Sequence, residues 1–178
     1  MTVLNLVLAL VGLLVALNLV LTVGLVRRIR DHTQQLARLN APTVTEVALP
    51  AGAMVKDFVT TSIDGRHIEF NELGQTLVGV FSPHCSACEA SLPQFTERAA
   101  EPTGLPFLAV VAAREGDADA LVARMPPTAI VVVESDGGPV QQSLGVTGYP
   151  AFLLLERGVV QASSYDLNVV LDKTVSAA

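Results

Sequence analysis

Short apolar runs alternate with amphipathic stretches along most of the chain. Apolar runs bounded by turn residues are typical of strands buried on both faces, and apolar positions three or four apart are typical of helices. We expect strands at 76–81, 106–112, 129–134, 151–155 and 159–163, and helices at 88–100, 117–124, 139–144 and 166–175. This alternation predicts an α/β fold with a mixed central sheet flanked by helices.

Two turn signals predict hairpins. The pair Asp64-Gly65 separates short extended pieces at 57–61 and 66–70, and the triplet 156–158 separates the last two strands. Gly in such short connections supplies the backbone conformations that tight turns require.

The most apolar segment lies at the N-terminus. Residues 3–26 carry no charge, and at about 1.5 Å per residue a helix of this length spans roughly 36 Å, more than a ~30 Å hydrocarbon core. No basic residue precedes the run, unlike a cleaved signal peptide. We therefore expect a transmembrane anchor at 1–26, a juxtamembrane helix and linker at 27–52, and the folded domain at 53–178.

The predicted location is the cell membrane, crossed once, with the lipid bilayer as a partner. The positive-inside rule, applied to Arg27, Arg28, Arg30 and Arg38, places the folded domain in the cytoplasm. The cysteine chemistry described below favours the extracytoplasmic side. The sequence leaves both alternatives open.

Charge excludes one class of partner. The chain carries −6 overall, and from Asn40 onward it holds 7 basic and 16 acidic residues, a net −9. A domain this acidic does not attract nucleic acid. The arginines that follow the apolar run suit lipid headgroups, or form a solvated face.

The only two cysteines are Cys85 and Cys88, placed where the strand 76–81 gives way to the helix 88–100. At a helix N-terminus, unpaired N–H groups and the macrodipole favour the thiolate, which is the attacking species. We expect Cys85 to attack a disulfide and Cys88, one turn further on, to resolve the mixed disulfide. The predicted function is thiol–disulfide exchange on proteins, without a cofactor.

Two further segments flank this chemistry. We expect Pro83 and His84 to tune the site, since His84 as imidazolium would favour the Cys85 thiolate; an exposed residue on the rim is the alternative. We expect Gly148-Tyr149-Pro150 to bind substrate, because a Tyr–Pro bond can be cis and then orients neighbouring backbone groups toward an extended peptide. A proline at the start of an ordinary strand is the alternative.

Together, Cys85-Ser-Ala-Cys88 and Gly148-Tyr149-Pro150 resemble the thioredoxin fold. The stretches 57–58, 64–66 and 72–74 resemble the extra N-terminal β-hairpin of the redoxin branch. With an anchor in front, residues 52–173 resemble the membrane-tethered TlpA/ResA-like group, including MauD-like proteins of methylamine utilisation.

The resemblance implies that Tyr149-Pro150 is cis and faces the cysteines, and that Pro93 kinks the active-site helix. It also implies action outside the cytoplasmic membrane, on a cysteine-containing protein substrate and with a redox partner protein. Two positions depart from the pattern: His84 replaces a common Trp, and Gly79 replaces the acid often buried six positions before the first cysteine. The direction of electron flow stays open, because that acid is the usual proton acceptor for the second cysteine.

The cysteine pair also admits other interpretations. A zinc site needs four ligands, and His32, His67 and His84 are scattered. A permanent disulfide across so short a loop gains little loop entropy. A redoxin-type peroxidase with Cys85 as the peroxidatic thiol, and a non-enzymatic Cu(I) or assembly factor using Cys85, Cys88 and His84, remain the alternatives.

Overall fold

The computed structural model describes residues 47–70, 73–102, 104–114 and 116–176, together with Asn5, Val7, Leu10 and Gly12. The chain divides into two compact units, Met1–Thr43 and Val44–Ala178. The four described residues of the first unit are helical. The second unit holds both cysteines and the sheet.

Five strands form a mixed sheet in the order β5-β4-β3-β6-β7. They are β3 (Thr76–Phe81), β4 (Phe107–Ala112), β5 (Ile130–Glu134), β6 (Ala151–Glu156) and β7 (Val159–Ser164). β3, β4 and β5 run parallel, whereas β6 is antiparallel to β3 and β7 is antiparallel to β6. Every residue of β3 and β4 is buried, which explains their unbroken apolar sequences. The predicted mixed sheet is confirmed.

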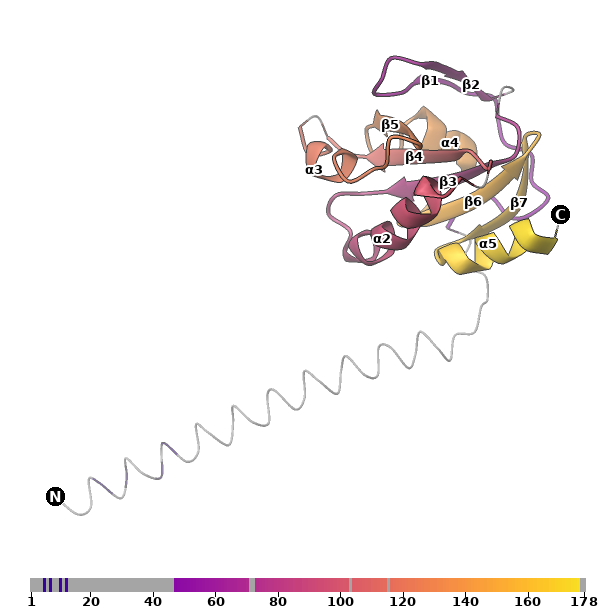
Figure 1. Cartoon of the computed structure of the whole chain (residues 1–178). Coiled ribbons are helices and arrows are strands. Elements are labelled where there is room, and N and C mark those ends of the chain that lie inside the picture. The colour runs from indigo at the N-terminus through magenta and orange to yellow at the C-terminus, as the bar shows by residue number, and fades with distance from the viewer. Residues whose placement is uncertain are drawn as a thin grey trace. The chain divides into compact units, whose positions relative to one another are not determined.

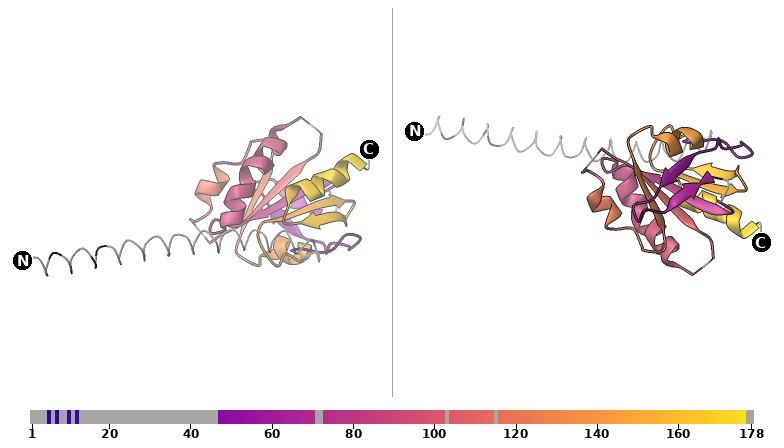
Figure 2. Two further views of the ribbon diagram at one scale, coloured as in Figure 1. Left: turned by 90° about the horizontal axis from the view of Figure 1, so that it is seen from below. Right: turned by 90° about the horizontal axis from the view of Figure 1, so that it is seen from above.

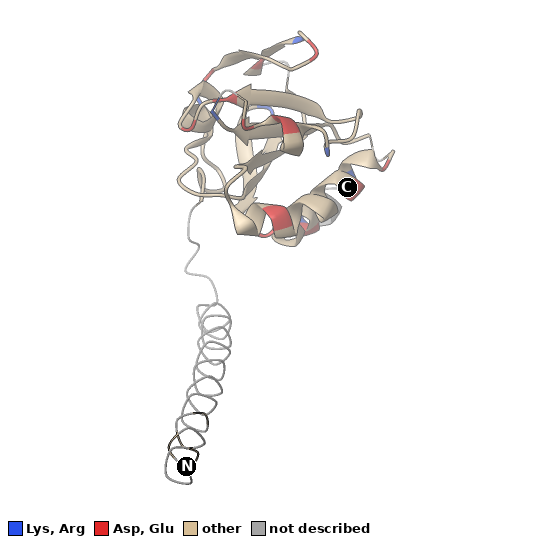
Figure 3. Cartoon of the chain, turned by 90° about the vertical axis from the view of Figure 1, so that its left-hand side faces the viewer, with Lys and Arg blue, Asp and Glu red and all other residues tan. Residues whose placement is uncertain are grey.

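Helices cover both faces of the sheet (Figures 1 and 2). They are α2 (Ser86–Ala100), α3 (Asp119–Val122), α4 (Pro139–Leu144) and α5 (Leu167–Ser176). Leu77 and Phe81 of β3 pack with buried residues of α2, α3 and α5, whereas Val78 and Val80 pack with α4. Successive residues of a strand point to opposite faces, so one strand feeds two separate cores. Asp and Glu positions are scattered over helices and loops (Figure 3).

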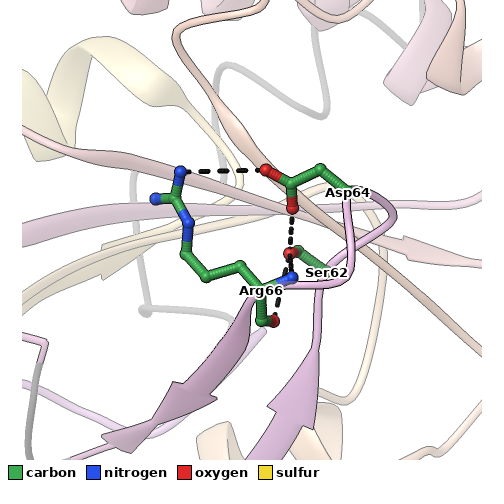
Figure 4. Close-up of polar contacts among 3 residues, drawn as sticks. All are labelled: Ser62, Asp64 and Arg66. Carbon is green, nitrogen blue, oxygen red and sulfur yellow. Dashed lines mark hydrogen bonds and ion pairs between the residues drawn. The ribbon is translucent and has the colours of Figure 1, made fainter.

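A second, two-stranded sheet consists of β1 (Val59–Thr61) and β2 (His67–Glu69), paired antiparallel. In its turn the Ser62 hydroxyl bonds the Asp64 carboxylate and accepts the Arg66 backbone N–H at 3.0 Å (Figure 4). The Ser62 hydrogen bond is the main reason that the pKa of Asp64 is lowered. The predicted turn is confirmed, while its identity with the redoxin hairpin stays a prediction.

The residues directly before the expected domain start also pack on the domain. Ala48 is buried, the Leu49 N–H donates to the Leu144 carbonyl at 2.9 Å, and the Gly52 N–H donates to the Val160 carbonyl at 2.7 Å. The compact unit, which begins at Val44, therefore includes part of the expected linker.

The predicted single-pass membrane localisation is contradicted. Among the residues that the structure describes, no helix is long and apolar enough to cross a bilayer. The longest described helix, α2, has 15 residues, fewer than the ~20 that a span needs. The apolar run 3–26 on which the prediction rested lies outside the described residues, apart from the four named above, as does the expected juxtamembrane helix.

Candidate active site

Cys85 is the N-cap residue of α2. Its backbone is extended, with φ −108° and ψ 110°, and its Sγ accepts a hydrogen bond from the Cys88 N–H at 3.1 Å. The Cys85 carbonyl accepts the first helical hydrogen bond, from Glu89 N–H at 3.1 Å. Sulfur thus takes the place of the usual capping oxygen, and both the N–H donor and the helix macrodipole stabilise negative charge on it. Because Cys85 is only half-buried, its sulfur suits attack on an external disulfide.

Cys88 occupies the first turn of α2 and is 1% exposed, packed with Leu92 and Phe95. Burial, together with the hydrogen bond to Cys85, raises the pKa of Cys88 to about 12. Both thiols are free in the structure. The two cysteines therefore differ as the sequence predicts: one is accessible, and one is held neutral in the core.

The Tyr149-Pro150 peptide bond is cis, as expected. The Cys85 Sγ donates to the Tyr149 carbonyl oxygen at 3.5 Å, so the segment before β6 faces the reactive thiol. Pro150 is buried, and Gly148 and Tyr149 are half-buried. A Cβ added at Gly148 would meet no atom within 4 Å. The predicted substrate-binding segment thus lies beside Cys85, with open space at Gly148.

The Tyr149 phenol is held by a polar cluster that the sequence did not reveal. Its hydroxyl shares its one proton between the Asp136 carboxylate and the side-chain oxygen of Gln141, which is buried. Burial and the Asp136 hydrogen bond raise the pKa of Tyr149 well above its usual range. The phenol therefore stays protonated, and its hydrogen bonds fix the Tyr149 side chain. The backbone carbonyl of the same residue contacts Cys85.

Glu134 anchors this cluster to α4. Its carboxylate accepts from the backbone N–H groups of Val140, at 3.0 Å, and Gln141, at 2.9 Å, and from Gln141 Nε2 at 2.9 Å. An acid before a helix that starts with proline, here Pro139, is a recognisable N-terminal signal. A half-buried tyrosine also requires a partner for its hydroxyl. Those two signals could have indicated a polar cluster here, but they do not identify Asp136 and Gln141 as its members.

His84 lies on the rim of the site. Its side chain is 80% exposed, and its Nε2 lies 3.6 Å from the Asp117 carboxylate, which follows β4. Pro83 is half-buried in the turn closed by the Cys85 N–H on the Ser82 carbonyl at 3.2 Å. The tuning roles of both residues stay predictions, and the contact seen for His84 is to Asp117.

Below the cysteines the core is aromatic. The Phe95 ring packs edge-on against Phe81 and Phe107, with centroids 5.0 and 5.4 Å away, and stacks at 6.1 Å on Phe152. Pro93 lies inside α2, as expected, and the kink it was expected to cause stays a prediction. Among the described residues, no three His, Cys, Asp or Glu side chains gather as a metal site, so the copper alternative finds no three-ligand group there.

No protein-family model matches the sequence, and no curated protein matches it. Solved structures do. The thioredoxin domain of a thiol-disulfide oxidoreductase from Bacteroides vulgatus is 18% identical with a TM-score of 0.59, covering 72% of this chain and 98% of that one. A thiol:disulfide interchange protein DsbE from Chlorobium tepidum is 21% identical with a TM-score of 0.61, over 72% and 98%.

A secreted disulfide oxidoreductase from Mycobacterium tuberculosis is 15% identical with a TM-score of 0.54, over 67% of this chain and 91% of that one. At such identities the likeness establishes the fold. The chain has the thioredoxin fold, as predicted, and the structures it resembles are thiol–disulfide oxidoreductases. A MauD-like specificity is not shown by any of them.

Proposed function

We propose that this protein is a thiol–disulfide oxidoreductase that acts on protein disulfides, with Cys85 as the attacking thiol and Cys88 as the resolving thiol. One observation carries the proposal. The Cys85 sulfur caps α2, is reachable from outside and lies 3.5 Å from the carbonyl next to the cis-proline, while Cys88 waits one turn behind it in the core.

In the reducing direction, the Cys85 thiolate attacks one sulfur of a substrate disulfide. A Cys85–substrate disulfide forms, the substrate disulfide breaks, and the leaving thiolate takes a proton from water. Cys88 then loses its proton and attacks the Cys85 sulfur, which closes the Cys85–Cys88 disulfide and releases the second substrate thiol. Two electrons pass to the substrate, and a redox partner protein with its own dithiol restores the pair. The oxidising direction runs through the same steps in reverse.

The segment Gly148-Tyr149-Pro150 supplies the surface on which the substrate chain lies. An extended peptide can pair with exposed backbone groups next to the cis-proline, and the open space at Gly148 leaves room for it. Such pairing uses only the substrate backbone, so it holds a substrate sulfur near Cys85 whatever the substrate's side chains are. The segment would therefore serve many disulfides.

The test is the pair of single-cysteine variants, assayed on insulin reduction. Cys85→Ser should abolish activity, while Cys88→Ser should accumulate mixed disulfides visible as a higher mass under non-reducing conditions. Ala100→Ser places a serine at an exposed position at the far end of α2; it is the control and should behave as the unaltered protein. Full activity in Cys85→Ser would rule the proposal out. Rapid peroxide consumption that needs Cys85 but not Cys88 would replace it with the peroxidase.

A further inference from the structure

A pocket of about 380 Å³ lies beside the candidate active site, at the ends of three parallel strands. It is lined by residues that follow β3, β4 and β5 and by the residue before the cis-proline, and those used below are Ser82, His84, Arg114, Asp117, Asp136 and Tyr149. In α/β proteins, ligands bind in the crevice outside the carboxyl ends of parallel strands. The position of the pocket is therefore typical of a ligand-binding site.

Each of the two carboxylates around this pocket has a polar side-chain partner. The Asp117 carboxylate faces His84 at 3.6 Å, and the Asp136 carboxylate accepts from the Tyr149 hydroxyl. Arg114 has no carboxylate partner among the residues that the structure describes, and it is exposed. Within the described part of the chain, the guanidinium of Arg114 is therefore a pocket-lining cation whose charge and N–H donors face no carboxylate.

Arg114 is unusual among the arginines of this domain. The other four arginines described in the structure each lie within 4 Å of a carboxylate: Arg66 with Asp64, Arg98 with Glu101, Arg124 with Glu89, and Arg157 with Glu156. An acidic domain contains many carboxylates that can pair with an arginine. Arg114, which lines a pocket and has no carboxylate partner among the described residues, is therefore distinct from the other four. A carboxylate is the anion that a guanidinium fork matches best.

The pocket and the reactive thiol share a wall. Tyr149 is one of the lining residues, and its hydroxyl is hydrogen-bonded to Asp136. The backbone carbonyl oxygen of Tyr149 lies 3.5 Å from the Cys85 sulfur. His84, another lining residue, directly precedes Cys85. Neighbouring residues of a bound peptide are about 3.8 Å apart at Cα. A substrate cysteine held at Cys85 therefore places the side chain of an adjacent residue over the pocket.

We propose that this pocket selects polypeptide substrates with an acidic residue next to the reactive cysteine, whose carboxylate pairs with Arg114. The inference rests on the proposed function, because it assigns the substrate preference of the same site. Backbone pairing at Tyr149-Pro150 holds any substrate chain, and Arg114 distinguishes between chains.

The experiment measures the first step alone. Reduced full-length protein is mixed with peptides whose single cysteine is a disulfide with 2-thiopyridine, and the Cys85 thiolate displaces pyridine-2-thione, which is followed by absorbance. The peptides carry Asp, Asn or Lys on either side of the cysteine. We expect the Asp peptide to react about three- to fivefold faster than the Asn peptide at low salt, and the advantage to shrink in high salt because the pair is exposed.

Two variants locate the preference. Arg114→Gln should bring the ratio of Asp to Asn rates to about one, and Arg114→Glu should reverse it in favour of the Lys peptide, a gain that a folding defect cannot produce. Arg66→Gln removes the same charge from a residue outside the pocket lining and should keep the Asp preference.

The outcomes separate the two proposals. Equal rates for all peptides, or an Asp preference that survives Arg114→Glu, would overturn the pocket assignment while thione release that depends on Cys85 still supports the oxidoreductase. Absence of thione release with every peptide would overturn the proposed function itself. Glutathione carried as its own mixed disulfide with 2-thiopyridine is the small-thiol probe. If it releases thione faster than the Asp peptide and loses that advantage in Arg114→Gln, the carboxylate site belongs to a small thiol and the polypeptide assignment is overturned.

Discussion

The ring of Phe95 fills the space that a side chain at Gly79 would need. A Cβ built on Gly79 would lie 2.6 Å from Phe95 Cε2 and 2.8 Å from Phe81 Cε2, closer than real Cβ contacts. Gly79 is the position where the thioredoxin pattern often buries an acid near the second cysteine. Any side chain at Gly79, a carboxylate included, would therefore clash with the rings of Phe95 and Phe81 in this core.

Enlarging Gly79 should therefore destabilise the fold. Gly79→Ala pushes a methyl group into two fully buried rings, and overpacking of this kind reduces the free energy of unfolding by about 1–3 kcal/mol. Urea unfolding followed by circular dichroism measures the loss. The matched control is Gly74→Ala, where a Cβ meets nothing within 4 Å and stability should change little. Equal effects at the two positions would contradict the packing argument.

The absence of an acid at Gly79 also sets the pH dependence of the second chemical step. Burial, the largest cause of the raised Cys88 pKa of about 12, does not depend on the state of Cys85. The hydrogen bond and charge of Cys85 that add to this pKa change in the mixed disulfide, but burial still keeps Cys88 protonated near neutral pH, so its thiolate fraction should rise about tenfold per pH unit from pH 6 to 8. We expect the release of peptide thiol from a preformed Cys85 mixed disulfide, measured by stopped flow, to follow that slope. A rate that levels off below pH 8 would show that another group takes up the proton.

The apolar strands and the cysteine pair could be read from the sequence, because both are local signals. β3 is a run of buried residues that ends at Phe81, and the turn residues 82–84 separate it from Cys85. The partners of Tyr149 could not be found in this way, since Asp136 and Gln141 reach it only after β5 and α4 have packed. The packing of residues 47–52 was hidden for the same reason: their hydrogen bonds go to Leu144 and Val160, far away along the chain.

The membrane localisation failed for a different reason. It rested on the hydropathy of residues 3–26 and on the lack of a basic residue before them. That segment is almost wholly outside the described part, and no described helix has the required length and apolarity. Hydropathy describes a segment by itself, whereas the cysteine prediction combined a strand, a helix start and a second motif. Agreement among independent local signals made the site prediction the stronger one.

Ionisation of Cys88 should also reduce the stability of the reduced protein at alkaline pH. The folded-state pKa is raised above the ordinary thiol value of 9.0 to about 12, so the stabilising effect is complete below pH 9. Between those values the unfolded chain loses the proton and the folded chain keeps it, so stability falls by at most about 1.4 kcal/mol per pH unit. Urea unfolding of the reduced protein at pH 7, 9 and 10 measures this slope. In Cys88→Ala, the unfolding free energy should fall less steeply with pH, because the contribution of Cys88 is removed. An unchanged slope in that variant would show that other groups cause the fall.

The hydroxyl of Tyr149 offers the sharpest test of the polar cluster, because the chain contains a matched control. Tyr149→Phe removes the hydrogen bonds to Asp136 and Gln141 but keeps the ring and the carbonyl that faces Cys85. We expect the free energy of unfolding to fall by about 1–2 kcal/mol, since one acceptor is charged and the other belongs to a buried amide. We also expect a lower rate of mixed-disulfide formation, because the ring that positions the carbonyl is no longer fixed. Tyr165→Phe deletes the same atom from an exposed tyrosine and should change neither quantity by a measurable amount. Equal stability losses in the two variants, with disulfide exchange unaffected, would show that the cluster does not hold Tyr149 in place.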